Sequence, residues 1–176
     1  LISVSRNAGA GTITNSFGYD VLGRKTLQVD PDTGTTTFQY NALGELIAQS
    51  DNGGYRTEHE IDARGRVWRI TAKLPDGSVE SQRVSVFDTV AGGIGQLSSE
   101  TVTGQYAAWS GQSGMGLNYR RDIGYDAMGR VVHALTTVDE QWFMAGMEYD
   151  SLGRPWKAQD ASGLWVKTQY GSRGAI

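Results

Sequence analysis

The sequence predicts an all-β fold in which repeated β-hairpins pair edge to edge into one long, twisted antiparallel sheet. The main observation is a six-residue phrase, typified by Tyr-Asp-x-x-Gly-Arg, whose first three copies begin at residues 19, 40 and 61, each 21 residues after the last. The second observation is that runs rich in β-branched and aromatic residues flank the copies, while no stretch sustains the 3.6-residue periodicity of a helix. A fixed period of about 20 to 50 residues is typical of repeat architectures, in which each unit is stabilised by its neighbours.

The copies of the phrase share an aromatic or apolar first position, Asp or Asn at the second position and Gly at the fifth. Their defining residues are Tyr19, Asp20, Gly23 and Arg24; Tyr40, Asn41, Gly44 and Glu45; Ile61, Asp62, Gly65 and Arg66; Tyr125, Asp126, Gly129 and Arg130; and Tyr149, Asp150, Gly153 and Arg154. A last copy begins at Tyr170 and is cut short. We interpret these residues as the structural motif of the repeat.

Residues 35–55 illustrate how one unit is expected to fold. Residues 35–40 are rich in Thr and aromatic side chains, which suit a strand. Residues 41–44 predict a type I turn, because the Asn side chain can accept hydrogen bonds from amides ahead of it and Gly can adopt a positive φ. Residues 45–50 then form the return strand, and residues 51–54 form a second turn that leads into the next unit.

Two further features recur from unit to unit. The second turn is repeated at residues 30–34, 75–77 and 160–163. On the return strand, the third residue after the turn glycine is mostly large and apolar, and we expect it to be packed. This position is occupied by Thr26, Ile47, Trp68, Val132 and Trp156.

We predict one repeat domain over residues 1–176. Because Leu1 is not an initiator methionine and the final phrase is truncated, we expect this domain to be a segment of a longer protein. Its units span residues 19–39, 40–60, 61–86, 87–124, 125–148, 149–169 and, truncated, 170–176.

The unit at residues 87–124 is irregular. Phe87 and Asp88 keep the start of the phrase, but the turn after them is enlarged and Gly-rich, and a longer loop follows. Since recognition residues are often carried on loops, any specificity is expected between Gly92 and Asn118. A tolerated insertion without function is the alternative.

Composition excludes several classes of partner. The net charge of −3 disfavours a nucleic-acid partner, which selects basic surfaces. No apolar stretch approaches the roughly 18 residues of a membrane-spanning helix, so no membrane insertion is expected. The absence of cysteine rules out disulfides and thiolate metal sites, and His59 and His133 have no partner at ligand spacing. We therefore expect no metal and no cofactor.

No convergent catalytic set is present, so the sequence does not predict an enzyme. There is no Gly-x-Ser-x-Gly segment that would mark a nucleophile. Asp139 and Glu140 could act as paired carboxylates, but adjacent residues on a strand point to opposite faces.

The phrase at this spacing resembles the YD repeats of RHS-type proteins, which include the B and C components of bacterial insecticidal toxin complexes, wall-associated proteins and teneurins. The copies beginning at Tyr19, Tyr125 and Tyr149 match fully, and those at Tyr40 and Ile61 depart at one or two positions. The resemblance implies a sheet that spirals into a hollow shell around a toxic C-terminal polypeptide. It also implies an aspartic self-cleavage site in a core segment, but no Asp-Pro-x-Gly motif occurs here, so that activity is not carried over.

The Asp and Arg of the phrase, four residues apart, allow two interpretations. They could form a charged ladder that faces cargo or ligand. Alternatively, Asp caps the turn and Arg brackets it across the mouth of the hairpin, which we favour because turn chemistry alone requires Asp or Asn at this position.

The sequence thus favours a non-catalytic scaffold segment of an exported bacterial protein, secreted or at the cell surface. Its expected partners are flanking repeats or the C-terminal cargo of the same protein, and unprotected sheet edges would allow self-association. The alternative is a carbohydrate-binding module that contacts cell-surface glycans through exposed aromatic side chains. The candidate ligand-binding residues for that function are Trp109, Tyr106 and Trp142.

Overall fold

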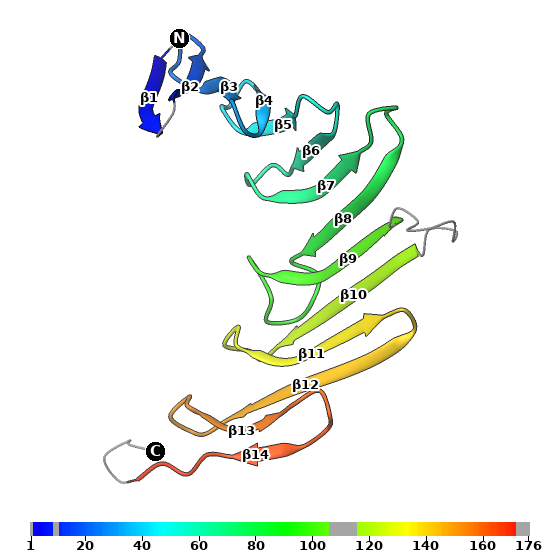
Figure 1. The fold of residues 1–176 in the computed structure, drawn as a ribbon. Helices are drawn as coiled ribbons and strands as arrows, with labels where there is room; N and C mark the ends of the chain where they lie inside the picture. The colour runs from blue at the N-terminus through cyan, green and yellow to red at the C-terminus, as the bar shows by residue number, and fades with distance from the viewer. Residues whose placement is uncertain (1, 9–10, 106–115, 172–176) are drawn as a thin grey trace. The chain divides into compact units, whose positions relative to one another are not determined.

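The computed structural model describes residues 2–8, 11–105 and 116–171. In this part of the chain all regular structure is β-strand (Figure 1). The strands are β1 Ile2–Ala8, β2 Gly11–Tyr19, β3 Lys25–Asp30, β4 Gly34–Tyr40, β5 Leu46–Ser50, β6 Arg56–Ile61, β7 Val67–Lys73, β8 Val79–Phe87, β9 Leu97–Gln105, β10 Gly116–Tyr125, β11 Val131–Val138, β12 Gln141–Tyr149, β13 Pro155–Gln159 and β14 Trp165–Lys167.

The chain divides into two compact units, Leu1–Gln82 and Arg83–Ile176. Within the first unit, strands β1 to β7 each pair antiparallel with the next strand in sequence. Within the second unit, β9 to β14 do the same. The predicted all-β antiparallel meander is therefore confirmed.

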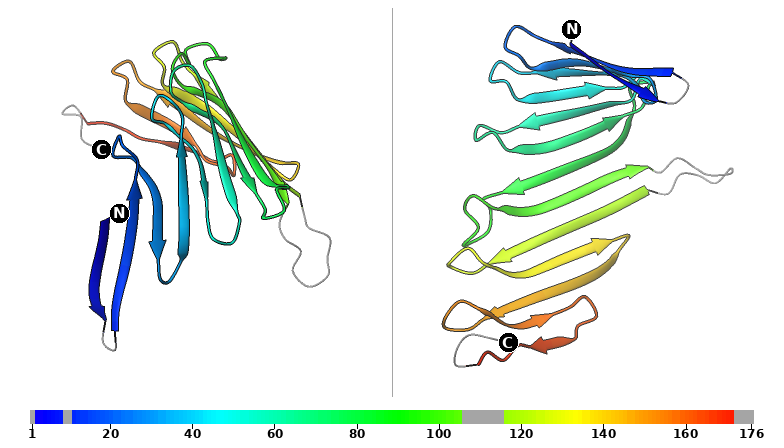
Figure 2. Two further views of the ribbon diagram at one scale, coloured as in Figure 1. Left: turned by 90° about the horizontal axis from the view of Figure 1, so that it is seen from above. Right: turned by 60° about the vertical axis from the view of Figure 1, so that its left-hand side comes forward.

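Within each unit, the turns of the phrase all lie at the same end of the strands. They join β2 to β3, β4 to β5 and β6 to β7 in the first unit, and β10 to β11 and β12 to β13 in the second. Because successive strands run in opposite directions, the other turns lie at the opposite end of the strands, as the right-hand view of Figure 2 shows for the second unit. The phrase thus places chemically equivalent turns side by side.

Every phrase hairpin contains the same β-bulge. The register skips one residue on the return strand just after each phrase turn. The skipped residue is the one that the sequence marked as mostly large and apolar, and in each case it is partly buried. These residues are Thr26, Ile47, Trp68, Val132 and Trp156. A bulge at this place increases the local twist of the hairpin.

Little of the chain is buried. Among the described side chains, the only buried hydrophobic ones are Ala48, Ile123 and Ala134. Within each unit the described strands contact only their neighbours in sequence, so each unit is a single-layered sheet. Its stability must come from backbone pairing and cross-strand side-chain contacts, which contribute about 0.2–1 kcal/mol per pair.

Candidate functional site

The phrase turn is held by its aspartate. In the β12–β13 turn, Asp150 Oδ1 accepts hydrogen bonds from the backbone amides of Leu152 and Arg154, each at 2.9 Å. Asp150 Oδ2 accepts a bond from Arg154 Nε at 2.8 Å. The Gly153 amide donates to the Asp150 carbonyl at 2.9 Å, and Gly153 has a φ of 79°. Asp20, Asp62 and Asp126 are bonded to their turns in the same way.

These bonds keep the phrase aspartates ionised. The backbone amide of the arginine four residues ahead is the largest cause that holds the pKa of each carboxyl below 3.8, and the guanidinium of the same arginine adds to it. This applies to Asp20, Asp62, Asp126 and Asp150. The hydrogen bonds agree with the turn-capping interpretation of the Asp–Arg pair.

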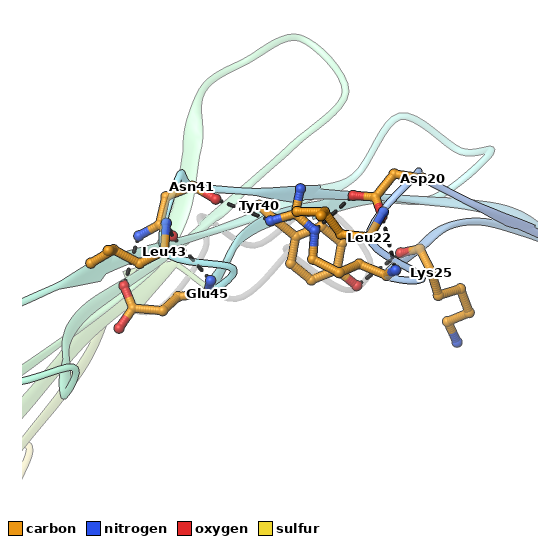
Figure 3. A network of polar contacts seen from close by, with 8 residues as sticks. Asp20, Leu22, Lys25, Tyr40, Asn41, Leu43 and Glu45 are labelled. Carbon is orange, nitrogen blue, oxygen red and sulfur yellow. Dashed lines mark hydrogen bonds and ion pairs between the residues drawn. The ribbon is translucent and has the colours of Figure 1, made fainter.

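The arginine also contacts the next repeat, which sequence reasoning missed. The Arg24 guanidinium lies 4.9 Å from the centre of the Tyr40 ring, and Arg24 Nη1 donates to the Asn41 carbonyl at 3.2 Å. The Tyr40 hydroxyl reaches back and donates to the carbonyl of Lys25 at 2.8 Å (Figure 3). We call this arrangement, arginine of one phrase against tyrosine of the next, the inter-repeat Tyr–Arg contact.

The same contact recurs in the second unit. Arg130 lies 4.2 Å from the Tyr149 ring, and the Tyr149 hydroxyl donates to the carbonyl of Val131 at 2.9 Å. Arg154 lies 4.2 Å from the ring of Tyr170 in the truncated last phrase. Each tyrosine therefore fastens its hairpin to the preceding one.

The irregular unit keeps the contact in a modified form. Gln96 occupies the place of the arginine, and its Nε2 donates to the Gly129 carbonyl of the following phrase at 2.7 Å. The Tyr125 hydroxyl donates to the carbonyl of Leu97 at 2.8 Å, as in the regular copies. The enlarged turn thus leaves the link between repeats in place.

One link lacks both partners at once. Glu45 stands where the other phrases have Arg, and Ile61 stands where the next phrase would have Tyr. Within its own turn, Glu45 accepts a hydrogen bond from Asn41 Nδ2 at 2.7 Å, while Asn41 Oδ1 still accepts the two turn amides at 3.0 Å (Figure 3). The joint loss of Arg and Tyr was the sequence signal for a contact between repeats.

The predicted ligand-binding residues fall in different parts of the chain. Tyr106 and Trp109 lie outside the described residues. Trp142 lies on β12 and is 68% exposed. Its neighbour Met144 is 41% exposed on the same face, and Phe143 is 40% exposed on the opposite face.

The other described tryptophans have cationic side chains against their rings. Arg69 lies 4.2 Å from the ring of Trp68, and Lys157 lies 4.0 Å from that of Trp165. Lys167 Nζ lies 5.4 Å from the centre of the Trp156 ring. Such contacts are worth about 0.5–1 kcal/mol at exposed sites and agree with packing within the sheet.

The two carboxylates considered for catalysis lie in a turn rather than on a strand. Asp139 and Glu140 connect β11 to β12 and have positive φ values of 45° and 71°. The Asp139 amide donates to the Asn118 carbonyl at 3.0 Å, and Asp139 Oδ1 accepts the Asn118 amide at 3.3 Å. The expectation that Asp139 and Glu140 lie on a strand is therefore wrong, because the pair closes the hairpin between β11 and β12.

The described residues contain neither a metal-binding cluster nor a helix that could span a membrane. No group of three or more His, Asp or Glu side chains in residues 2–8, 11–105 and 116–171 is arranged to hold a metal ion. In the same ranges, no helix has the length and apolar character needed to cross a membrane.

Comparisons with known proteins identify the repeat. Residues 19–57 match the family model described as RHS Repeat. A structure of TcdB2-TccC3 without its hypervariable C-terminal region is 10% identical over 95% of this chain and 12% of that chain, with a TM-score of 0.33. A TcdB2-TccC3-TEV structure is 13% identical over 96% of this chain and 12% of that chain, with a TM-score of 0.35. A porin-like protein from Bacteroides uniformis ATCC 8492 is 10% identical over 97% of this chain and 90% of that chain, with a TM-score of 0.41.

These TM-scores are all too low to carry an inference about function, and the chain spans only 12% of the length of the toxin-complex chains. The match to the repeat model is independent of them and covers the first complete phrase and the second, which lacks the arginine. The resemblance drawn from the phrase is confirmed there: residues 19–57 of this chain are RHS-repeat sequence.

Proposed function

We propose that this chain is a non-catalytic scaffold segment of an exported bacterial RHS-type protein, secreted or displayed at the cell surface. In this proposal it forms part of a wall that encapsulates or presents a toxin or surface effector. The observation that carries it is the inter-repeat Tyr–Arg contact. In the described residues, the phrase aspartates hold their own turns, and Arg24, Arg130 and Arg154 lie against the tyrosine of the following phrase, so the recurrent side chains have structural roles.

The small number of buried side chains among the described residues supports the same function. A single-layered sheet joined repeat by repeat can be extended indefinitely without a growing core, which suits a wall better than a compact enzyme. The partners that follow are flanking repeats and the C-terminal cargo of the same polypeptide.

Limited proteolysis of the natural polypeptide that contains this chain tests the encapsulation. The region that follows the repeats should be cut by trypsin more slowly within the polypeptide than when the same region is expressed alone. Equal cleavage rates would contradict a wall that encloses cargo.

A second function, carbohydrate binding, is supported by the exposure of Trp142. An indole ring left 68% accessible on a sheet face offers an apolar surface on which a sugar ring can stack. A glycan array probed with this chain and with Trp142→Ala tests it. If the unaltered chain binds a glycan that Trp142→Ala does not bind, the result supports carbohydrate binding. If the unaltered chain binds no glycan, the result contradicts it.

Self-association through sheet edges is a further expectation of the scaffold. In the described part of the chain, the outer edges of β1 and β14 pair with no other strand. Exposed edges allow copies to pair. Sedimentation should therefore show association that increases with concentration, and a strict monomer at high concentration would count against it.

A further inference from the structure

We propose that the second unit carries a binding site for neutral saccharides, formed by the hollow beside Arg120 and Asp122 and extended along the same face to Trp142. This inference rests on the carbohydrate-binding function proposed above and adds to it the polar half of the site.

The hollow is formed where the repeat pattern fails. It has a volume of about 390 Å³ and lies between the enlarged turn, at Thr89, and the sheet residues Arg120, Asp122 and His133. The regular phrase turn is too short to place residues in this way. The enlarged turn therefore provides one side of a concave site, and the sheet provides the other.

The sheet residues of this site share one face. Arg120 on β10 is in register with Thr137 on β11, which is in register with Trp142 on β12. Asp122 lies two residues from Arg120 on the same strand and therefore points to the same face. Trp142 is two strands away from Arg120, about 10 Å at the usual strand spacing. A ligand that spans this distance can contact the polar pair and the indole together.

The polar pair is suited to hydroxyl groups. Arg120 and Asp122 form a bidentate ion pair, with Nε–Oδ2 at 2.7 Å and Nη2–Oδ1 at 2.6 Å. Their side chains remain 58% and 35% exposed, so the guanidinium can still donate and the carboxylate can still accept. This combination matches a sugar hydroxyl, which both accepts and donates hydrogen bonds.

Charge balance decides which saccharides fit. The guanidinium and the carboxylate neutralise each other within the site, and the guanidinium holds the pKa of Asp122 below its usual range, so the carboxylate stays charged. A charged ligand would meet one group that attracts it and one that repels it, so it would lose hydration without a net electrostatic gain. The site therefore favours an uncharged, hydroxyl-rich ligand over phosphorylated or sulfated ones.

The chain offers a matched control for each half of the site. Arg121 follows Arg120 on β10, and Phe143 follows Trp142 on β12. Both control residues are exposed, and both lie on the opposite face of the sheet. Each pair of variants thus removes a similar side chain from the same strand and differs mainly in the face affected.

The test is a glycan array that carries neutral, sulfated and sialylated oligosaccharides, followed by titration calorimetry with a retained neutral oligosaccharide. We expect neutral glycans to be retained. Arg120→Ala and Trp142→Ala should each weaken binding by about tenfold, the equivalent of about 1.4 kcal/mol, whereas Arg121→Ala and Phe143→Ala should leave it unchanged. Thermal unfolding of the four variants checks that the sheet is retained.

Four results would overturn the site. Retention of sulfated or sialylated glycans alone would contradict the charge argument. Equal weakening by the variants of the two faces would show that the effect is not local. If Trp142→Ala weakened glycan binding and Arg120→Ala did not, the chain would still bind glycans through Trp142, but the hollow beside Arg120 would not be part of the site. No retention of any glycan by the unaltered chain would refute both the site and the carbohydrate-binding function, without affecting the scaffold.

Discussion

The hydroxyl of Tyr40 provides the sharpest prediction about how the repeats are joined. It donates to the Lys25 carbonyl of the preceding return strand at 2.8 Å, while its ring lies against Arg24. Tyr40→Phe removes this hydrogen bond and keeps the ring. A neutral hydrogen bond contributes about 0.5–1.5 kcal/mol net, so the free energy of unfolding should fall by about 1 kcal/mol. For a cooperative unit of 60–100 residues, this corresponds to a decrease of about 4–8 °C in melting temperature.

The matched control is Tyr19→Phe in the same unit. Residues 1–18 contain no copy of the phrase and so supply no phrase arginine to Tyr19, which is 44% exposed. Among the described residues its hydroxyl makes no hydrogen bond. Urea unfolding of the whole chain should show a loss for Tyr40→Phe and almost none for Tyr19→Phe. Equal losses would refute the inference that the hydroxyl acts by joining repeats.

Three further predictions follow from the same geometry. Gly153→Ala should cost more stability than Gly163→Ala, as urea unfolding would show. The positive φ strains either alanine by about 1–2 kcal/mol. A Cβ at Gly153 would also lie 3.0 Å from a guanidinium nitrogen of the preceding phrase, whereas the nearest side-chain atom to a Cβ at Gly163 is 3.9 Å away. The folded pKa of the phrase aspartates lies below the unfolded value of 3.8, so these carboxylates stabilise the folded state above that pH. This contribution should be lost as the pH falls through the folded pKa. Melting temperatures that stay level between pH 2 and 6 would contradict it. Glu45→Arg combined with Ile61→Tyr should rebuild the missing contact, so that the double variant is more stable than the two single changes predict by about 0.5–1 kcal/mol, as thermodynamic coupling measured by urea unfolding would show.

The sequence predicted the hairpins closely because their signals are local. Asn41 and Gly44 specify a turn through their own backbone and side-chain chemistry, and β4 and β5 begin and end within a residue or two of the expected strands. The expectation that Ile47 would be packed also agrees with the structure, although its position in a bulge could not be read from alternation alone.

The contact between repeats was harder to predict because it joins residues about 16 positions apart. Tyr40 was interpreted as a strand residue, and Arg24 as a partner across its own turn or as part of a charged ladder; neither interpretation placed Arg24 against the next phrase. The paired replacement at Glu45 and Ile61 was visible in the sequence, but its meaning depends on register between hairpins, which no single phrase specifies.

The candidate ligand site shows the same limit. Exposure of Trp142 could be suspected from its place outside the phrase, but the polar pair Arg120 and Asp122 carries no motif. Their relation to Trp142 exists only through the pairing of β10, β11 and β12. Sites made by sheet register are therefore less predictable than turns.

The arginine of one phrase and the tyrosine of the next join successive hairpins at Arg24–Tyr40 and Arg130–Tyr149. A double-mutant cycle on Arg130→Ala and Tyr149→Phe, extended to Tyr149→Ala, tests it most directly, since the two residues lie on different hairpins and 4.2 Å apart. Urea unfolding should give a coupling energy of about 0.5–1 kcal/mol between Arg130→Ala and Tyr149→Ala, and less with Tyr149→Phe, which keeps the ring. A coupling of zero with Tyr149→Ala would show that this contact does not join the two hairpins.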